Sequence, residues 1–369
     1  MIKVGIIGCG KIADSHAEQI QRIAGSEIVG VCDKEKLMAK QLYERFPVKQ
    51  YFSDANKLLE LKPDIVHITT PPQSHFVLGK LCLEAGSHVY MEKPFTLNTS
   101  EAEQLIGLAT EKKLKITVGH DDQFTHATRR MREYIKNGYL GGTPVHMESY
   151  YCYDLGNINY AKSLLGDKRH WVRSLPGQLL QNNISHGICR IAEFLKDDNP
   201  KVIANGFTSK FLQSMDETDI IDELRVIIEG CDNVTAYFTF SSQMRPVLHH
   251  FRVYGPKNAL IVDHYNQTII KVNGCKYKSY LDKFIPPVVF AKQYAANFIH
   301  NINLFLKRDF HMKSGMKYLI ESFYKSVTEN APLPISYREI LLTSKIMDSI
   351  FEQINAQKLI RNKDLATKC

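Results

Sequence analysis

The residues that could do chemistry begin with Tyr90-Met91-Glu92-Lys93-Pro94, which close an apolar stretch and are therefore predicted to lie at the end of a strand. Proline restricts the preceding Lys93 to extended backbone angles and stops the strand, so the lysine side chain has a defined direction. A lysine partly withdrawn from water can lose its proton near neutral pH and act as a general base. A lysine at a strand end is more often a solvated charge, so the catalytic interpretation depends on what surrounds it.

A second set of polar residues recurs at every fourth position: Asn182, His186 and Arg190. On a helix this spacing places them on one face, where two hydrogen-bonding groups one turn apart could hold a substrate hydroxyl and relay its proton. In isolation, a helix-capping Asn182 and an ordinary helical histidine explain the same pattern. A separate, apolar face of the predicted helix consists of Ile184, Ile188, Ile191 and Leu195.

The elements that must position these residues start with a strand, a glycine turn and a helix. An apolar run at 2–7 is followed by Gly8-Cys9-Gly10-Lys11-Ile12-Ala13. Gly8 permits the tight turn, Gly10 lets the backbone approach a pyrophosphate, and Ala13 lets helix and strand pack closely. Lys11 and Ile12 begin the helix, whose N-terminus attracts phosphate. Alone, the motif is weak evidence for a dinucleotide site, and its position between a strand and a helix strengthens that evidence.

A second predicted strand, 27–32, ends in Asp33, which lies 20 residues after Ala13. At that distance a carboxylate would accept the ribose hydroxyls of a dinucleotide and repel a 2′-phosphate, which favours NAD over NADP. Lys34 and Lys36 lie close enough to weaken this preference, so NADP stays possible. A helix cap or a turn is the alternative role for Asp33.

Alternating strands and helices continue as far as Gly119. Further strands are predicted at 64–70, 88–91 and 115–119, with helical patterns between them. This alternation predicts a parallel sheet, which binds ligands beyond the carboxyl edge of its strands. The residues expected on that edge are the glycine turn, Asp33, Thr70, His75 and Lys93.

The motifs Gly8-x-Gly10-x-x-Ala13, Thr70-Pro71 with His75, and Glu92-Lys93-Pro94, in this order and spacing, resemble the Gfo/Idh/MocA family. That family includes glucose–fructose oxidoreductase and inositol dehydrogenase, and the resemblance covers most of the chain. It implies that Lys93 lies near the nicotinamide and the reacting substrate hydroxyl. It also implies cofactor contacts from residues at the strand ends: Thr70, Pro71, His75 and Glu92.

The same resemblance matches His186 to a family histidine that works with the lysine. Two departures accompany it. Asn182 stands where the family usually has an aspartate, and an amide can neither take a proton nor supply the charge that would raise the pKa of His186. The stretch Asp121-Asp122-Gln123-Phe124 replaces an Asn-x-Arg-Phe-like stretch, of which Phe124 alone matches well.

Beyond Gly119 the pattern changes from alternation to runs of strands. Strands separated by turns predict a large, open, mainly antiparallel sheet between 202 and 272. Helices are predicted at 289–306, 317–327 and 337–357, followed by a frayed polar tail at 358–369. The irregular, basic segment 153–176 could bind a polar substrate, form a mobile solvated loop or cover a neighbouring subunit.

The expected architecture therefore has two parts. Residues 1–122 form an α/β Rossmann domain that binds NAD(P). Residues 123–369 form an α+β domain for substrate binding and oligomerisation, whose C-terminal helices pack back on the first domain.

The composition indicates a globular protein outside the membrane. Of 369 residues, 44% are hydrophobic, and no apolar run approaches the roughly 18 residues of a membrane span. The first strand leaves no room for a signal peptide, and the eight cysteines form no CxxC pair or zinc-spaced cluster. We therefore expect reduced thiols, no metal and a cytoplasmic location. The net charge is +8, but the basic residues form no stripe interleaved with aromatics, which argues against binding to nucleic acid. The positive charge is compatible with an anionic small ligand.

Together these features predict an oxidoreductase that transfers hydride between NAD(P) and a secondary alcohol or ketone of a sugar, cyclitol or nucleotide sugar. Lys93 would exchange the hydroxyl proton, with His186 and Asn182 as partners. The open sheet would join subunits into a homodimer or homotetramer. The alternatives are an NAD-dependent glycosidase of the same fold and a non-catalytic dinucleotide-binding sensor, which the departures at Asn182 and Gln123 favour.

Overall fold

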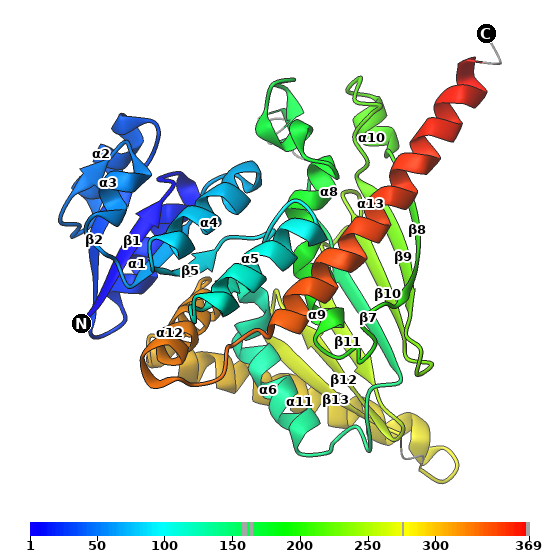
Figure 1. Ribbon diagram of the computed structural model, residues 1–369. Coiled ribbons are helices and arrows are strands. Elements are labelled where there is room, and N and C mark those ends of the chain that lie inside the picture. The colour runs from blue at the N-terminus through cyan, green and yellow to red at the C-terminus, as the bar shows by residue number, and fades with distance from the viewer. Residues whose placement is uncertain (157–160, 163–164, 275–276, 367–369) are drawn as a thin grey trace. The chain divides into compact units, whose positions relative to one another are not determined.

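The computed structural model describes residues 1–156, 161–162, 165–274 and 277–366. The chain divides into two compact units. The first unit comprises Met1–Phe124 and Gly315–Ser344, and the second comprises Thr125–Ser314 and Lys345–Cys369. Each unit is built around one sheet (Figure 1).

The first unit has a six-stranded sheet in the order β3-β2-β1-β4-β5-β6, with every pair parallel. The order reverses between β1 and β4, which is the point where doubly wound sheets bind ligands. The predicted parallel sheet is therefore confirmed, although the short strand β3 was missed because two residues carry no periodicity. Its strands are β1 (Ile2–Ile7), β2 (Ser26–Cys32), β3 (Tyr51–Phe52), β4 (Ile65–Ile68), β5 (His88–Met91) and β6 (Ile116–Val118).

Helices connect these strands and bury their apolar sides against the sheet. Asn98 caps the helix after β5, because its side chain accepts a hydrogen bond from the N–H of Glu101 at 2.9 Å. The connecting helices are α1 (Lys11–Gln21), α2 (Lys36–Arg45), α3 (Ala55–Leu59), the 3-10 helix η1 (Pro72–Ser74), α4 (His75–Glu84), α5 (Thr99–Glu111) and the 3-10 helix η2 (Asp121–Phe124).

A late segment of the chain completes this first core. Helix α12 (Ser314–Glu329) buries Leu319, Ile320 and Phe323 in the same apolar cluster as the strands. Its residue Tyr324 reaches His67 in the middle of β4. The first unit is therefore stabilised by a segment about 200 residues away from its own sheet.

The second unit has a seven-stranded sheet in the order β13-β12-β11-β7-β10-β9-β8. Only the central pair β7–β10 is parallel, and the other pairs are antiparallel, which confirms the expected mainly antiparallel sheet. Its strands are β7 (His146–Tyr151), β8 (Lys201–Phe207), β9 (Glu223–Glu229), β10 (Thr235–Ser241), β11 (His249–Tyr254), β12 (Asn258–Asp263) and β13 (Thr268–Asn273).

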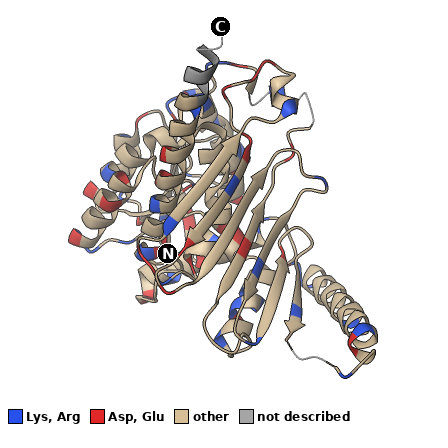
Figure 2. Ribbon diagram, turned by 90° about the vertical axis from the view of Figure 1, so that its right-hand side faces the viewer, with Lys and Arg blue, Asp and Glu red and all other residues tan. Residues whose placement is uncertain are grey.

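The two faces of this sheet differ. Side chains alternate between buried and exposed along β8, β9 and β10. The exposed face carries Ile203, Ile227 and Tyr237, and Figure 2 shows these strands without a helix in front of them. On the other face, α9 packs on β7 and β10. The helices of this unit are α6 (His126–Lys136), the 3-10 helix η3 (Trp171–Ser174), α8 (Gln178–Asn183), α9 (Ser185–Ala192), α10 (Lys210–Gln213) and α11 (Leu281–Leu306).

The last helix differs from the prediction. Helix α13 runs from Tyr337 to Ala366, so the frayed tail expected at 358–369 is wrong for its described part. The ammonium group of Lys358 donates hydrogen bonds to the side chain of Gln178 and the carbonyl of Asp219, which holds this turn to the second unit. No described helix, α13 included, is both long and apolar enough to cross a membrane.

Candidate functional site

The glycine turn between β1 and α1 leaves open space at the carboxyl edge of the first sheet. Gly8 has a φ of +98°, and a Cβ there would lie 2.7 Å from the backbone nitrogen of Thr70. A Cβ on Gly10 would meet no heavy atom within 4 Å. The first N–H groups of a helix lack intrahelical partners and attract phosphate, and here they belong to Lys11 and Ile12. The turn therefore fits a dinucleotide pyrophosphate.

Asp33, the residue after β2, lies against this turn. One carboxylate oxygen accepts a hydrogen bond from the N–H of Cys9 at 2.7 Å, and the other accepts one from Glu35 at 2.9 Å. Burial, together with the charge of Asp33, raises the pKa of the Cys9 thiol, so Cys9 stays neutral. The structure thus fixes the Asp33 carboxylate beside the turn, where the sequence pattern expects the ribose.

His75 connects two loops at the same edge. Its ring is fully buried, with Nε2 2.9 Å from the carbonyl of Thr70 and Nδ1 2.9 Å from the carbonyl of Pro94. Burial lowers the pKa of His75 and outweighs these carbonyl contacts. Because the ring lies between the Thr70-Pro71 loop and the segment after Lys93, it positions both. A cofactor contact from His75 itself stays a prediction.

A buried chain of four side chains lies behind Glu92. Glu92 Oε1 is 2.8 Å from His16 Nε2, and His16 Nδ1 is 2.8 Å from His67 Nδ1. His67 Nε2 is 2.9 Å from the hydroxyl of Tyr324. His16 donates to the Glu92 carboxylate, while the contact between the two rings and the contact with Tyr324 can be made in either direction, because a ring nitrogen donates or accepts according to its tautomer. The chain therefore supplies a buried hydrogen-bond donor to an ionised Glu92.

Electrostatics keep Glu92 ionised within this chain. Burial lowers the pKa of His67 far below its ordinary value. Burial alone would raise the pKa of Glu92, but its hydrogen bond and charge interaction with His16, together with Lys93, lower that pKa to about 2. Glu92 also accepts a hydrogen bond from the N–H of Lys93 at 3.2 Å. A permanent negative charge therefore stands directly before Lys93.

His120 is a further residue at this edge, and the sequence reasoning missed it. It follows the end of β6, is 2% exposed, and neither ring nitrogen has a hydrogen-bond partner among the described residues. Burial is the main cause that lowers its pKa to about 4, opposed by Glu92 and reinforced by Lys93. The feature of the sequence that could have identified His120 is its position, because the histidine comes just after a strand end on the ligand-binding edge of the sheet.

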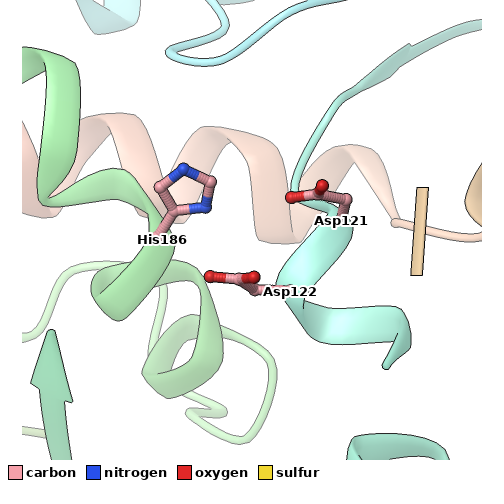
Figure 3. Close-up of side chains that lie close together, drawn as sticks. All are labelled: Asp121, Asp122 and His186. Carbon is pink, nitrogen blue, oxygen red and sulfur yellow. The ribbon is translucent and has the colours of Figure 1, made fainter. Parts of the chain in front are cut away.

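The second unit holds the other two predicted catalytic residues. Asn182 lies in α8, whose N-cap is Gly177, so the interpretation of Asn182 as a helix cap is wrong. His186 lies in α9, and Ile184 separates the two helices, which were expected as one. Figure 3 shows His186 on α9, and Asp121 with Asp122 on η2 of the first unit.

Tight packing fixes His186 within its own unit. The ring stacks on Tyr151 of β7, with centroids 5.0 Å apart. A Cβ on Gly187 would lie 2.2 Å from the Phe238 ring of β10, so only glycine lets α9 approach the sheet this closely. The carbonyl of Gly187 also accepts a hydrogen bond from Ser149 at 2.9 Å.

The segment 153–176 is only partly described, because 157–160 and 163–164 lie outside the described residues. Its described part includes η3 and a small buried cluster. Leu155, Leu165 and Val172 pack there with Leu212 and Ile220. The expectation of an irregular, solvated loop is therefore too simple, since part of the segment has a core of its own.

Comparison with known proteins adds to this geometry. Residues 2–120 match the Gfo/Idh/MocA family model, described as an oxidoreductase family with an NAD-binding Rossmann fold. The chain is 33% identical over 132 residues to UDP-N-acetylglucosamine 3-dehydrogenase from Acidithiobacillus ferrooxidans, covering 36% of this chain and 41% of that protein. It is 25% identical over 141 residues to myo-inositol 2-dehydrogenase from Thermotoga maritima, covering 38% and 42%. The matched segments thus span about two fifths of these relatives.

The likeness of the fold extends further. A solved structure of the Acidithiobacillus ferrooxidans enzyme superposes with a TM-score of 0.71 at 20% identity, covering 96% of this chain and 98% of that one. The second unit therefore has the relative's fold as well. Residues 2–120, which carry the glycine turn and the strand-end motifs, therefore match the NAD-binding Rossmann domain of the Gfo/Idh/MocA oxidoreductase family.

Proposed function

We propose that the protein is an NAD(P)-dependent dehydrogenase or reductase that acts on a secondary alcohol or ketone of a sugar, cyclitol or nucleotide sugar. One observation carries the proposal. An open glycine turn, the Asp33 carboxylate and a lysine preceded by a buried carboxylate share the carboxyl edge of one parallel sheet. Two similar proteins are named as dehydrogenases of a nucleotide sugar and of a cyclitol, which supports the substrate class.

The first unit would hold the dinucleotide. The N–H groups of Lys11 and Ile12 at the start of α1 would bind the pyrophosphate beside Gly8 and Gly10, and Asp33 would accept the ribose hydroxyls. When bound, the nicotinamide supplies a hydride acceptor or donor. Thr70, Pro71, His75 and Glu92 shape the adjoining edge, with His75 holding the loops in place. We propose NAD as the preferred cofactor, because Asp33 would repel a 2′-phosphate.

Lys93 would exchange the proton of the reacting hydroxyl. Glu92 fixes a negative charge next to it, and in ketone reduction the ammonium form of Lys93 would donate the proton. In the oxidising direction the neutral amine would accept the proton. From the second unit we propose His186 and Asn182 as substrate contacts, supported by the family resemblance of their motif and by the rigid packing of α9.

We also propose that subunits associate through the open face of the seven-stranded sheet and that the protein works in the cytoplasm. Exposed Ile203, Ile227 and Tyr237 on that face support the first proposal, because an apolar sheet face is a typical interface. Free, buried thiols at Cys9, Cys32 and Cys82 support a reducing compartment.

The direct test follows nicotinamide absorbance with sugars, inositols and nucleotide sugars as substrates, using NAD and NADP in both directions. A substrate-dependent change supports a dehydrogenase. Cleavage of a glycoside without net NADH would instead identify the glycosidase. Tight NADH binding, seen by fluorescence, with no turnover on any substrate would identify the sensor and overturn the proposed activity.

A further inference from the structure

Helix α11 of the second unit turns polar side chains toward the sheet and apolar side chains toward solvent, the reverse of an ordinary amphipathic helix. It lies along β13, the edge strand of the seven-stranded sheet. The side-chain amide of Gln293 donates to the carbonyl of Lys271 and accepts from its N–H, at 3.0 and 2.7 Å. Asn297 makes the same pair of bonds with Ile269, at 2.8 and 3.2 Å. The polar face of the helix is therefore turned toward the sheet, where its side-chain amides hydrogen-bond to the backbone of β13.

The spacing explains this fit. Four helical residues rise ~6 Å, and two strand residues rise ~6.8 Å, so side chains four apart on α11 reach alternate residues of β13. Asn301, four residues further on, donates to the carbonyl of Asn266 at 3.1 Å. The amides close a strand edge whose N–H and C=O groups would otherwise invite another strand. An edge covered in this way leaves the opposite face of α11 for another purpose.

That opposite face is apolar and exposed. Phe284, Phe298 and Phe305 are 67%, 66% and 64% exposed, and Val288 and Ile302 lie between them. The charged residues of α11, Asp282, Lys283 and Lys292, are not part of this row. We call the following residues the α11 stripe: Leu281, Phe284, Val288, Ala291, Ala295, Phe298, Ile302 and Phe305.

The α11 stripe has the spacing of a coiled coil. Its members alternate steps of three and four residues over the whole helix, the a/d pattern of a helix seam. The sizes are also symmetric about the centre, with large residues at both ends and Ala291 and Ala295 in the middle. A seam of this kind matches itself when the second helix runs in the opposite direction.

We propose that the α11 stripe packs antiparallel against the same stripe of a second copy of this chain. With the helix centres aligned, the layers pair large residues with large ones and alanine with alanine, so the backbones approach closely at the two-fold axis. The layers are Leu281 with Phe305 of the partner subunit, Phe284 with Ile302 of the partner subunit, Val288 with Phe298 of the partner subunit, and Ala291 with Ala295 of the partner subunit.

The area agrees with a stable dimer. Tyr294, Ile299 and Leu306, exposed beside the stripe, extend the same apolar face. With ~100 Å² on each large side chain the face offers about 900 Å² per copy, against about 800 Å² per partner in a standard interface. A membrane-surface helix is less well matched, because such helices present Lys and Arg on their polar face. Here that face carries the amides that bind β13.

Mass measurement by light scattering tests the proposal. Phe298→Glu should lower the oligomer mass by half, while Val77→Glu, an equally exposed apolar position on α4, should leave it unchanged. Tyr237→Glu on the open sheet face separates this interface from the one proposed above. With both interfaces the wild type is a tetramer and either variant is a dimer. Unchanged mass for Phe298→Glu, with retained circular dichroism, overturns the proposal.

Disulfide cross-linking gives a test that does not depend on a disruptive variant. A mixture of Ala291→Cys and Ala295→Cys chains should form a cross-linked dimer on oxidation, above the background from the wild type with its exposed Cys231. Cross-linking of Ala291→Cys alone at equal yield would indicate a parallel pair and contradict the register. A monomeric wild type that sediments with vesicles of phosphatidylcholine and phosphatidylglycerol would overturn the proposal in favour of a membrane-surface helix.

Discussion

Glu92 Oε1 lies 2.8 Å from Nε2 of His16, and this buried contact stands directly before Lys93. The contact keeps the Glu92 carboxylate ionised where burial alone would favour its neutral form. It also ends a chain of hydrogen bonds that extends through His67 to the Tyr324 hydroxyl. The charge next to Lys93 is therefore maintained by residues from α1, β4 and α12.

Glu92 should make stability depend on acid pH. Its pKa falls from an ordinary 4.5 to about 2 in the folded protein, a difference equivalent to about 3 kcal/mol of folding free energy. Because the folded pKa is below the unfolded one, this contribution is complete above about pH 4.5 and is lost as the pH falls towards 2. Urea unfolding of the wild type and Glu92→Gln should therefore differ most at neutral pH and converge in acid. A pH-independent difference would contradict the assignment, and Glu84→Gln on exposed α4 is the control.

Lys93 should be required for turnover and dispensable for cofactor affinity. Lys93→Ala should lower kcat by about 10²- to 10⁴-fold, the range of general acid–base catalysis, while the Kd for NADH stays within a few-fold. Lys93→Arg keeps a positive charge beside Glu92 but cannot exchange the proton, so it should be nearly as slow. Steady-state kinetics and fluorescence titration measure the two quantities. Lys80→Ala, on the exposed side of α4, is the matched control, and normal turnover of Lys93→Ala would remove Lys93 from the mechanism.

Gly8 and Gly10 should respond differently to the same substitution. Gly10→Ala adds a methyl group where no protein atom lies within 4 Å, so stability should hold while affinity for NADH drops at least about tenfold through a clash with the pyrophosphate. Gly8→Ala forces alanine to a φ of +98° against Thr70, which should cost on the order of 1–3 kcal/mol of unfolding free energy. Thermal unfolding and NADH titration of both variants separate the effects. Equal affinity for Gly10→Ala and the wild type would place the pyrophosphate elsewhere.

Asp33 should set the preference between NAD and NADP. Asp33→Asn can still accept the hydrogen bond from Cys9 through its amide oxygen and loses only the one from Glu35, so the glycine turn should keep its shape. Without the negative charge, the ratio of NADPH to NADH affinity should rise by about tenfold, equivalent to roughly 1.4 kcal/mol. Fluorescence titration with both reduced cofactors measures it. An unchanged ratio would mean that Asp33 only holds the turn.

Asn182→Asp should show whether asparagine at this position lowers kcat relative to aspartate. The substitution introduces the residue type usual in the family that the chain resembles, and a carboxylate at the end of α8 close to His186 in sequence would favour the protonated ring. A rise in kcat with an alkaline shift of the pH profile is the expected result. A lower kcat with unchanged folding would instead mean that the amide of Asn182 contacts the substrate itself.

Much of the first unit could be predicted because its signals are local. The glycine turn, Asp33 and Lys93 each belong to a strand and the few residues after it, and parallel strands bring their carboxyl ends to one edge. The cap at Asn98 and the hairpin between β9 and β10 follow from local spacing as well. In these places the chemistry of neighbouring residues determines the structure.

Contacts between distant residues were decided by the tertiary structure alone. Tyr324 meets His67 across 257 positions of the chain, and no periodicity in the sequence links them. His120 carried only its position at a strand end, and the break at Ile184 divides a pattern that reads as one helix. The outward apolar face of α11 looked like ordinary core packing, because a sequence pattern shows that a helix has an apolar side but not which side meets the sheet. That direction depends on the hydrogen bonds of Gln293 and Asn297 with β13, which only the folded chain makes.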